Sequence, residues 1–156
     1  MAASRKALVN VFTLPMSLPR WLAMKQFDPA LHEQFDALAK RKAMRWLARH
    51  GIHAIENPDR FGVDLIVPTF GYCEVEVKAG WKHGQFPFPS LHLPYRKLKF
   101  IKLDKPTMFI VWNAGLDRLI WVEDWAINLE PVAINNRLMD REKFFDIPLT
   151  ACQQCS

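Results

Sequence analysis

The chain has 156 residues, of which half are hydrophobic and 24% are charged. This length suits one domain and is sufficient to bury a substantial core. The composition excludes a disordered chain and a multi-span membrane protein. The net charge of +5 permits a polyanionic partner but does not require one.

The charge is unevenly distributed along the chain. Residues 1–116 hold 17 basic and 9 acidic side chains, a balance of +8, whereas residues 117–156 have a balance of −3. A basic body favours a face that binds phosphate. Lysines and arginines that merely solvate helices would give the same count, so both interpretations stay open.

The three cysteines are too few for a disulfide framework, and Cys152 and Cys155 lack a second pair at zinc-ligand spacing. We therefore expect a reduced, intracellular and cytoplasmic protein. No apolar run approaches the roughly 18 residues of a membrane span, so we expect no membrane partner.

Residues 1–27 are expected to form an N-terminal arm. A helix is predicted over residues 29–50, because Asp28 and Pro29 suit its cap and first position and Gly51 suits its end. Short strands are predicted at 52–55, 63–67 and 72–77, then an aromatic loop at 79–90 and a basic helix at 94–103. Two further strands follow at 108–112 and 119–122.

The predicted fold is a single α/β domain with an α-β-β-β-α-β core and a mixed central sheet. We place this domain at residues 28–130. Residues 131–156 have weak periodicity and are expected to pack on the same domain as a C-terminal extension.

The strand predicted at 72–77 is where candidate chemistry begins. Side chains alternate across a strand, so Glu74, Glu76 and Lys78 share one face. Such a face could be solvated surface, but Asp64 stands in an otherwise apolar strand, where an unpaired carboxylate is costly. A three-residue loop at 69–71, with Gly71 left-handed, would place Asp64 opposite Glu76. A loop of two or four residues would place it opposite a valine.

Two carboxylates that converge on one face need a cation between them. Oxygen ligands suit Mg²⁺ or Mn²⁺, which would polarise a phosphoryl oxygen and lower the pKa of water. Lys78 would then stabilise charge in the transition state. Asp64 and Glu76 are the candidate metal ligands, and with Lys78 they form a candidate site for phosphodiester hydrolysis.

The pattern of Asp64 followed by Glu76-Val77-Lys78 across a hairpin resembles the PD-(D/E)XK nuclease superfamily. The order of elements over residues 28–122 agrees with the core of that family. The resemblance implies a restriction-endonuclease-like fold and a Mg²⁺-dependent nuclease. It also implies an acid on the first helix, for which Glu33 is preferred over Asp36, although acids near a helix start also favour the helix dipole.

By the same resemblance, the basic helix and the loop before it would contact nucleic acid through Arg96, Lys97, Lys99 and Lys82. A small domain favours cutting directed by DNA structure rather than by sequence, and related junction resolvases act as homodimers. RNA stays open as a substrate. The alternative is a binding or assembly module that retains the fold without cleaving.

Overall fold

The computed structural model describes residues 29–134 and 142–155, so the N-terminal arm expected at 1–27 lies outside the described residues. Helix α1 spans Pro29–Arg49, which confirms the first predicted helix. Gly51 follows it with a φ of +74°, a left-handed conformation that glycine adopts without strain. No helix in the described part of the chain is long and apolar enough to cross a bilayer.

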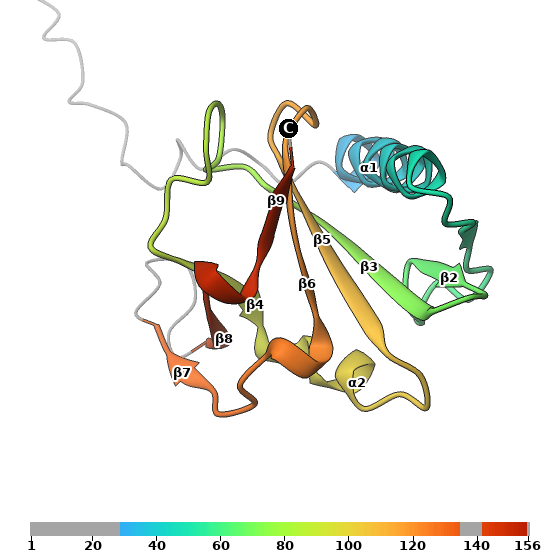
Figure 1. Ribbon diagram of the computed structural model, residues 1–156. Helices are drawn as coiled ribbons and strands as arrows, with labels where there is room; N and C mark the ends of the chain where they lie inside the picture. Colours follow the sequence, from blue (N-terminus) through green and yellow to red (C-terminus); the bar gives the residue numbers. More distant parts are fainter. Residues whose placement is uncertain (1–28, 135–141, 156) are drawn as a thin grey trace, which may run out of the picture.

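The main sheet has six strands in the order β1-β2-β3-β5-β6-β9 (Figure 1). They are β1 (Ile55–Glu56), β2 (Leu65–Val67), β3 (Gly71–Lys78), β5 (Thr107–Asn113), β6 (Leu119–Glu123) and β9 (Gln153–Cys155). Strands β3 and β5 are parallel, and the other neighbours are antiparallel. The prediction of an α/β fold with a mixed sheet is confirmed.

A second, three-stranded sheet has the order β4-β8-β7 and was not predicted. It consists of β4 (Ser90–Pro94), β7 (Val132–Ala133) and β8 (Lys143–Pro148). The residues assigned to a C-terminal extension thus supply β7 and β8 to this sheet and β9 to the edge of the main sheet. Leu91 pairs with Ile147, and Leu93 pairs with Phe145. The alternation of apolar residues at 91 and 93 and at 145 and 147 was the sequence signal for these strands.

The helix predicted at 94–103 is present over residues 95–101, but as two short turns rather than one continuous α-helix. Residues 90–94 are strand β4, and only a 3₁₀ turn, η2 (Tyr95–Lys97), and one α-helical turn, α2 (Leu98–Ile101), follow. Two more 3₁₀ turns are η3 (Asp124–Ala126) and η4 (Leu149–Ala151). Proline at position 94 suits a strand edge, and the β4 pairing with β8 overrides the helical pattern there.

Two cores lie on opposite faces of the main sheet. Ala39, Ala43 and Leu47 of α1 pack on one face, with apolar residues of β2, β3, β5 and β6. The other core joins β5 and β6 to the second sheet and to Phe100 of α2. The molecule therefore has three layers: α1, the main sheet, and the second sheet with α2. Alternation sends Cys73 and Val75 of β3 toward α1, so Glu74 and its even-numbered neighbours face the third layer.

The β2–β3 hairpin has a different register from the predicted one. Val67 pairs with Gly71 and Leu65 with Cys73, so Asp64 lies opposite Glu74 and not Glu76. A turn closed by the Phe70 N–H to the Val67 carbonyl, 2.9 Å, leaves Gly71 inside the strand. Glycine is required there by close approach, since a Cβ atom at position 71 would lie 2.3 Å from the Pro106 carbonyl oxygen.

Candidate functional site: a cluster of carboxylates and lysines

Lys97 joins the two glutamates of β3. Its ammonium group, at the end of η2, hydrogen-bonds the Glu74 carboxylate and lies 3.3 Å from Glu76 Oε1. The Glu74 side chain is 3% exposed and that of Lys97 is 14% exposed, so both groups are screened from water. A screened ammonium between two carboxylates interacts with both far more strongly than a surface pair would.

Asp64 is tied to β3 by two reciprocal hydrogen bonds. Its backbone N–H donates to Glu74 Oε1 at 3.0 Å, and its own Oδ2 accepts from the Val75 N–H at 2.8 Å. The hairpin therefore fixes the Asp64 carboxylate beside that of Glu74. The expected convergence of Asp64 with a β3 glutamate is present, but the partner in direct contact is Glu74.

A second ammonium group approaches Asp64 from α1. Lys40 Nζ lies 2.9 Å from Asp64 Oδ1 and 2.8 Å from Asp36 Oδ2. Although burial opposes its charge, hydrogen bonds to these two carboxylates raise the pKa of Lys40 above its usual range. We call Asp36, Asp64, Glu74 and Glu76, with Lys40 and Lys97, the carboxylate cluster.

The cluster perturbs the ionisation of its most buried member. Burial raises the pKa of Glu74 to about 7, with the charge of Asp64 adding to the effect and that of Lys97 opposing it. For Lys97, burial is outweighed by Glu74 and Glu76, so the pKa of this ammonium is raised and it stays charged. Perturbed groups of this kind gather at functional sites, although structural ion pairs produce them too.

Lys78 stands at the end of β3, beyond Glu76. Its ammonium group donates to the His92 carbonyl of β4 at 2.7 Å. Burial lowers the pKa of Lys78, and the charge of Glu76 only partly offsets this. A lysine with a lowered pKa transfers or shares a proton more readily than a surface lysine.

Glu33 lines a pocket of about 300 Å³ between α1 and the loop before β2. Asp36, Lys40 and Asp64 line the same pocket, together with Asp59 and others. Glu33 is exposed, and Asp36 rather than Glu33 shares a lysine with Asp64. The contacts thus favour Asp36 as the acid that α1 contributes to the cluster.

The four residues expected to bind nucleic acid differ in exposure and in contacts. Lys97 is partly buried and pairs with Glu74 and Glu76, and its predicted contact with phosphate stays a prediction. Arg96 is exposed and lies 3.2 Å from Glu142. Lys99 lies over the Phe100 ring, 4.5 Å from its centroid, and Lys82 is exposed in the loop before β4. Arg96, Lys99 and Lys82 remain accessible.

Sequence reasoning missed Lys40 and Glu74 as members of the site. Lys40 follows Asp36 at the i,i+4 spacing of a helix ion pair, which was a usable signal. Glu74 was assigned to the same strand face, but the register that brings it to Asp64 depends on where the turn ends.

The donor atoms of the cluster suit a hard divalent cation. All four carboxylates offer oxygen, and two pairs already converge on a positive charge: Asp36 with Asp64, and Glu74 with Glu76. Within residues 29–134 and 142–155, no three His, Cys, Asp or Glu side chains are grouped closely enough to hold a metal ion by themselves. A cation there would thus take two carboxylates and complete its shell with water or substrate oxygens.

Comparison of the chain with protein families, curated proteins and solved structures gives no match.

Proposed function

We propose that the protein is a metal-dependent nuclease that hydrolyses phosphodiester bonds in DNA. The observation that carries the proposal is the convergence of Asp36, Asp64, Glu74 and Glu76 on two lysine ammonium groups. Three of these carboxylates, Asp64, Glu74 and Glu76, are largely screened from water, and such groups are expensive to maintain unless their charge is used. A purely structural pair could be replaced by apolar side chains at little loss of stability.

The topology around the cluster supports the same proposal. A helix precedes the β1-β2-β3 meander, and a connection through η2 and α2 leads to β5, parallel to β3. Strand β4 of the second sheet also lies within this connection. Apart from β4, the order is compatible with the α-β-β-β-α-β core of the PD-(D/E)XK superfamily, which the motif of Asp64, Glu76 and Lys78 resembles. We infer that β3 carries the catalytic motif and that the C-terminal strands stabilise the sheet around it.

Mg²⁺ or Mn²⁺ would be held by two carboxylates of the cluster, which we assign to Asp64 and Glu76, and water or substrate oxygens would complete its shell. When bound, such an ion would polarise a phosphoryl oxygen and lower the pKa of a water molecule. Lys97 and Lys40 pair with these carboxylates and would offset part of their negative charge. Lys78, whose pKa burial lowers, would hold the attacking water or stabilise charge on the phosphate.

The accessible cations give the substrate a means of attachment. Lys82, Arg96 and Lys99 would contact backbone phosphates, which carry no sequence information. Their number is small, and cutting directed by strand structure is therefore the favoured form of the activity. A protein that binds DNA without cutting it is the alternative function.

The test is a cleavage assay with supercoiled, linear, single-stranded and four-way-junction DNA, in Mg²⁺, Mn²⁺ or EDTA. We expect cutting that requires the metal and falls by about 10²-fold or more in Asp64→Asn and in Lys78→Met, as for loss of one transition-state contact. The control is Glu130→Gln, which removes an exposed carboxylate outside the cluster.

Thermal unfolding of each variant shows whether the fold is retained. Undiminished cutting by both folded variants would contradict the assigned residues. Binding of DNA by the wild type without cutting of any substrate would favour the alternative function.

A further inference from the structure

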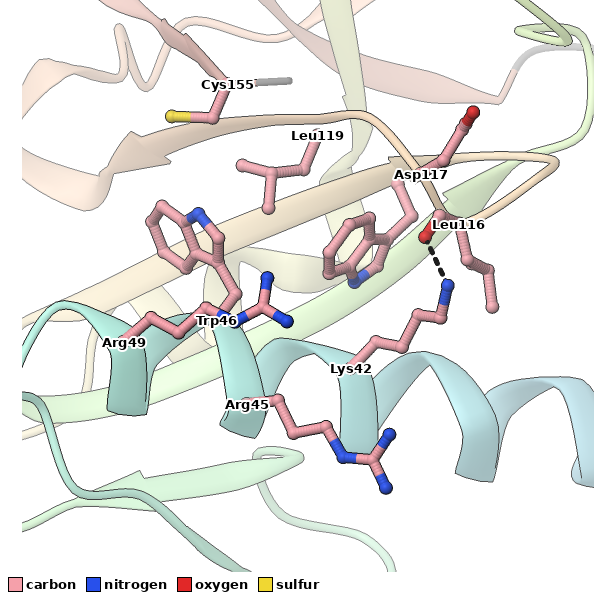
Figure 2. A pocket seen from close by; sticks show the side chains of 9 residues that line it. Lys42, Arg45, Trp46, Arg49, Leu116, Asp117, Leu119 and Cys155 are labelled. Atoms are coloured by element: carbon pink, nitrogen blue, oxygen red, sulfur yellow. Dashed lines mark hydrogen bonds between the residues drawn. The ribbon is translucent and has the colours of Figure 1, made fainter.

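A cavity of about 380 Å³ lies beside α1, and none of its lining residues belongs to the carboxylate cluster. Figure 2 shows the side chains that line it. Its floor comes from the β5–β6 turn, β6 and β9, through residues such as Leu116, Leu119 and Cys155. The volume falls within the range of small-ligand sites. The predicted nuclease chemistry makes no use of this cavity.

The two flanks of α1 have opposite charge. Glu33 and Asp36 precede Lys40 at i,i+3,i+7 spacing on the flank that faces Asp64. Lys42, Arg45 and Arg49 have the same spacing on the other flank, and all three line the cavity. Lys40 of one flank and Lys42 of the other are two residues apart, which is about 200° around the helix axis. One ligand therefore cannot contact both flanks. The buried face of α1 lies between them.

The cations of the cavity are available to a ligand. Arg45 and Arg49 are exposed, and neither guanidinium has a hydrogen bond or ion pair with the described part of the chain. Lys42 donates one hydrogen bond, to the Leu116 carbonyl at 2.8 Å, as Figure 2 shows, and two of its three N–H groups remain free to donate elsewhere.

An acid also lines the cavity, but it is already engaged. Asp117 Oδ1 accepts a hydrogen bond from Asn113 Nδ2 at 2.6 Å, and this bond lowers the pKa of Asp117. Three basic side chains against one carboxylate leave the cavity positive, which favours an anion. Guanidinium groups bind phosphate with two parallel hydrogen bonds, so phosphate is the anion that fits best.

Two indole rings line the same cavity, from Trp46 of α1 and Trp112 of β5. Trp112 is 6% exposed, and its indole N–H is buried without a hydrogen-bond partner among the described residues. Buried donors are almost always satisfied, and an acceptor on a ligand in this cavity, or an ordered water, would satisfy this one. Aromatic rings next to cations are also suited to a nucleobase, whose face stacks on any aromatic side chain.

We propose that this cavity binds a nucleoside monophosphate, with the phosphate at Lys42, Arg45 and Arg49 and the base against the tryptophans. The ligand is either a free nucleotide or the terminal nucleotide of a strand, since both present the same phosphate and base. The site is independent of the carboxylate cluster and needs no metal ion.

The test is calorimetric titration with adenosine 5′-monophosphate in EDTA, which separates binding from any cleavage. Adenosine and inorganic phosphate serve as the ligands that lack one half, and a short single strand with a 5′-phosphate serves as the second source. We expect the monophosphate to bind at least about tenfold more tightly than either half, because each half makes only part of the contacts.

Three variants test the location. The double variant Arg45→Gln and Arg49→Gln should weaken binding by about tenfold or more, and Trp112→Phe, which removes only the indole N–H and part of the ring, by several-fold. Arg41→Gln, which removes an exposed charge of the same helix outside the cavity, should leave the affinity unchanged.

Tighter binding of the 5′-phosphorylated strand than of the free nucleotide would support the site and assign its ligand to a strand end. The reverse would support the site and assign its ligand to a free nucleotide. Two results would overturn the proposal: no saturable binding of either ligand, or equal affinities in Arg41→Gln and in the Arg45→Gln and Arg49→Gln double variant.

Discussion

Glu74 is only 2% exposed, and its ionisation is coupled to folding. Its carboxylate accepts hydrogen bonds from Lys97 and from the Asp64 N–H, yet burial still raises its pKa to about 7. In the unfolded chain the same group has a pKa near 4.5. Between these values the unfolded chain loses a proton that the folded protein retains, so this group lowers stability as pH rises.

Replacement of Glu74 by Gln should therefore change how stability depends on pH. At pH 4 position 74 is largely neutral in the wild type, as it is in the variant, so the free energies of unfolding of the two proteins should differ little. As pH rises from 4.5 to 7, Glu74→Gln should gain up to about 3 kcal/mol over the wild type, at 1.36 kcal/mol per pKa unit. Urea unfolding at several pH values measures the difference, with Glu130→Gln as the control. A difference that is constant from pH 4 to 8 would contradict the assigned ionisation.

At the scale of elements, the β2–β3 hairpin shows what sequence reasoning could and could not predict. Alternation along β3 correctly placed Glu74, Glu76 and Lys78 on one face. The predicted register was wrong: Asp64 lies opposite Glu74 instead of Glu76. The reason is that the turn ends at Phe70, so Gly71 belongs to the strand. A shift of two residues along β3 keeps Asp64 on the same face of the sheet but changes the residue opposite it. No local signal reveals that Pro106, from a distant loop, needs a glycine there.

Replacement of Gly71 by Ala tests this explanation of the turn. The added Cβ would lie 2.3 Å from the Pro106 carbonyl oxygen, which also accepts the Tyr72 N–H at 2.9 Å. We expect a loss of about 1–3 kcal/mol in the free energy of unfolding, the usual range for overpacking. Gly51→Ala is the matched control, since position 51 has a left-handed φ but nothing within 4 Å of the added atom. A smaller loss at position 71 than at position 51 would contradict the steric argument.

Short elements whose existence depends on distant partners escaped prediction. The helix at 29–49 has its own cap signals and periodicity, and it was predicted to within one residue. Strands β7 and β9 have two and three residues, so their pairing with β8 and β6, not their sequence, defines them. The carboxylate cluster was half predicted for the same reason: Asp64 and Glu76 form a motif, whereas Lys40 and Lys97 reach it only through the fold.

At the scale of the whole molecule, the charge is organised around α1 and β3. The acidic flank of α1 and the even-numbered residues of β3 concentrate negative charge, and the other flank of α1 concentrates positive charge. The charges of these two sites largely cancel each other, so the net charge of +5 comes mainly from residues outside them. We infer that one site holds a cation and the other an anion, which explains why total charge alone indicates neither.

The central claim is that the carboxylate cluster binds a divalent cation, and Mn²⁺ titration followed by electron paramagnetic resonance tests it most directly. We expect saturable binding by the wild type and unchanged binding by Glu130→Gln. Asp64→Asn should weaken it at least about tenfold, since loss of even an outer partner of a metal ligand has an effect of 10–100-fold. Wild-type protein that binds no Mn²⁺, or a folded Asp64→Asn variant that binds it as tightly as the wild type, would contradict the claim.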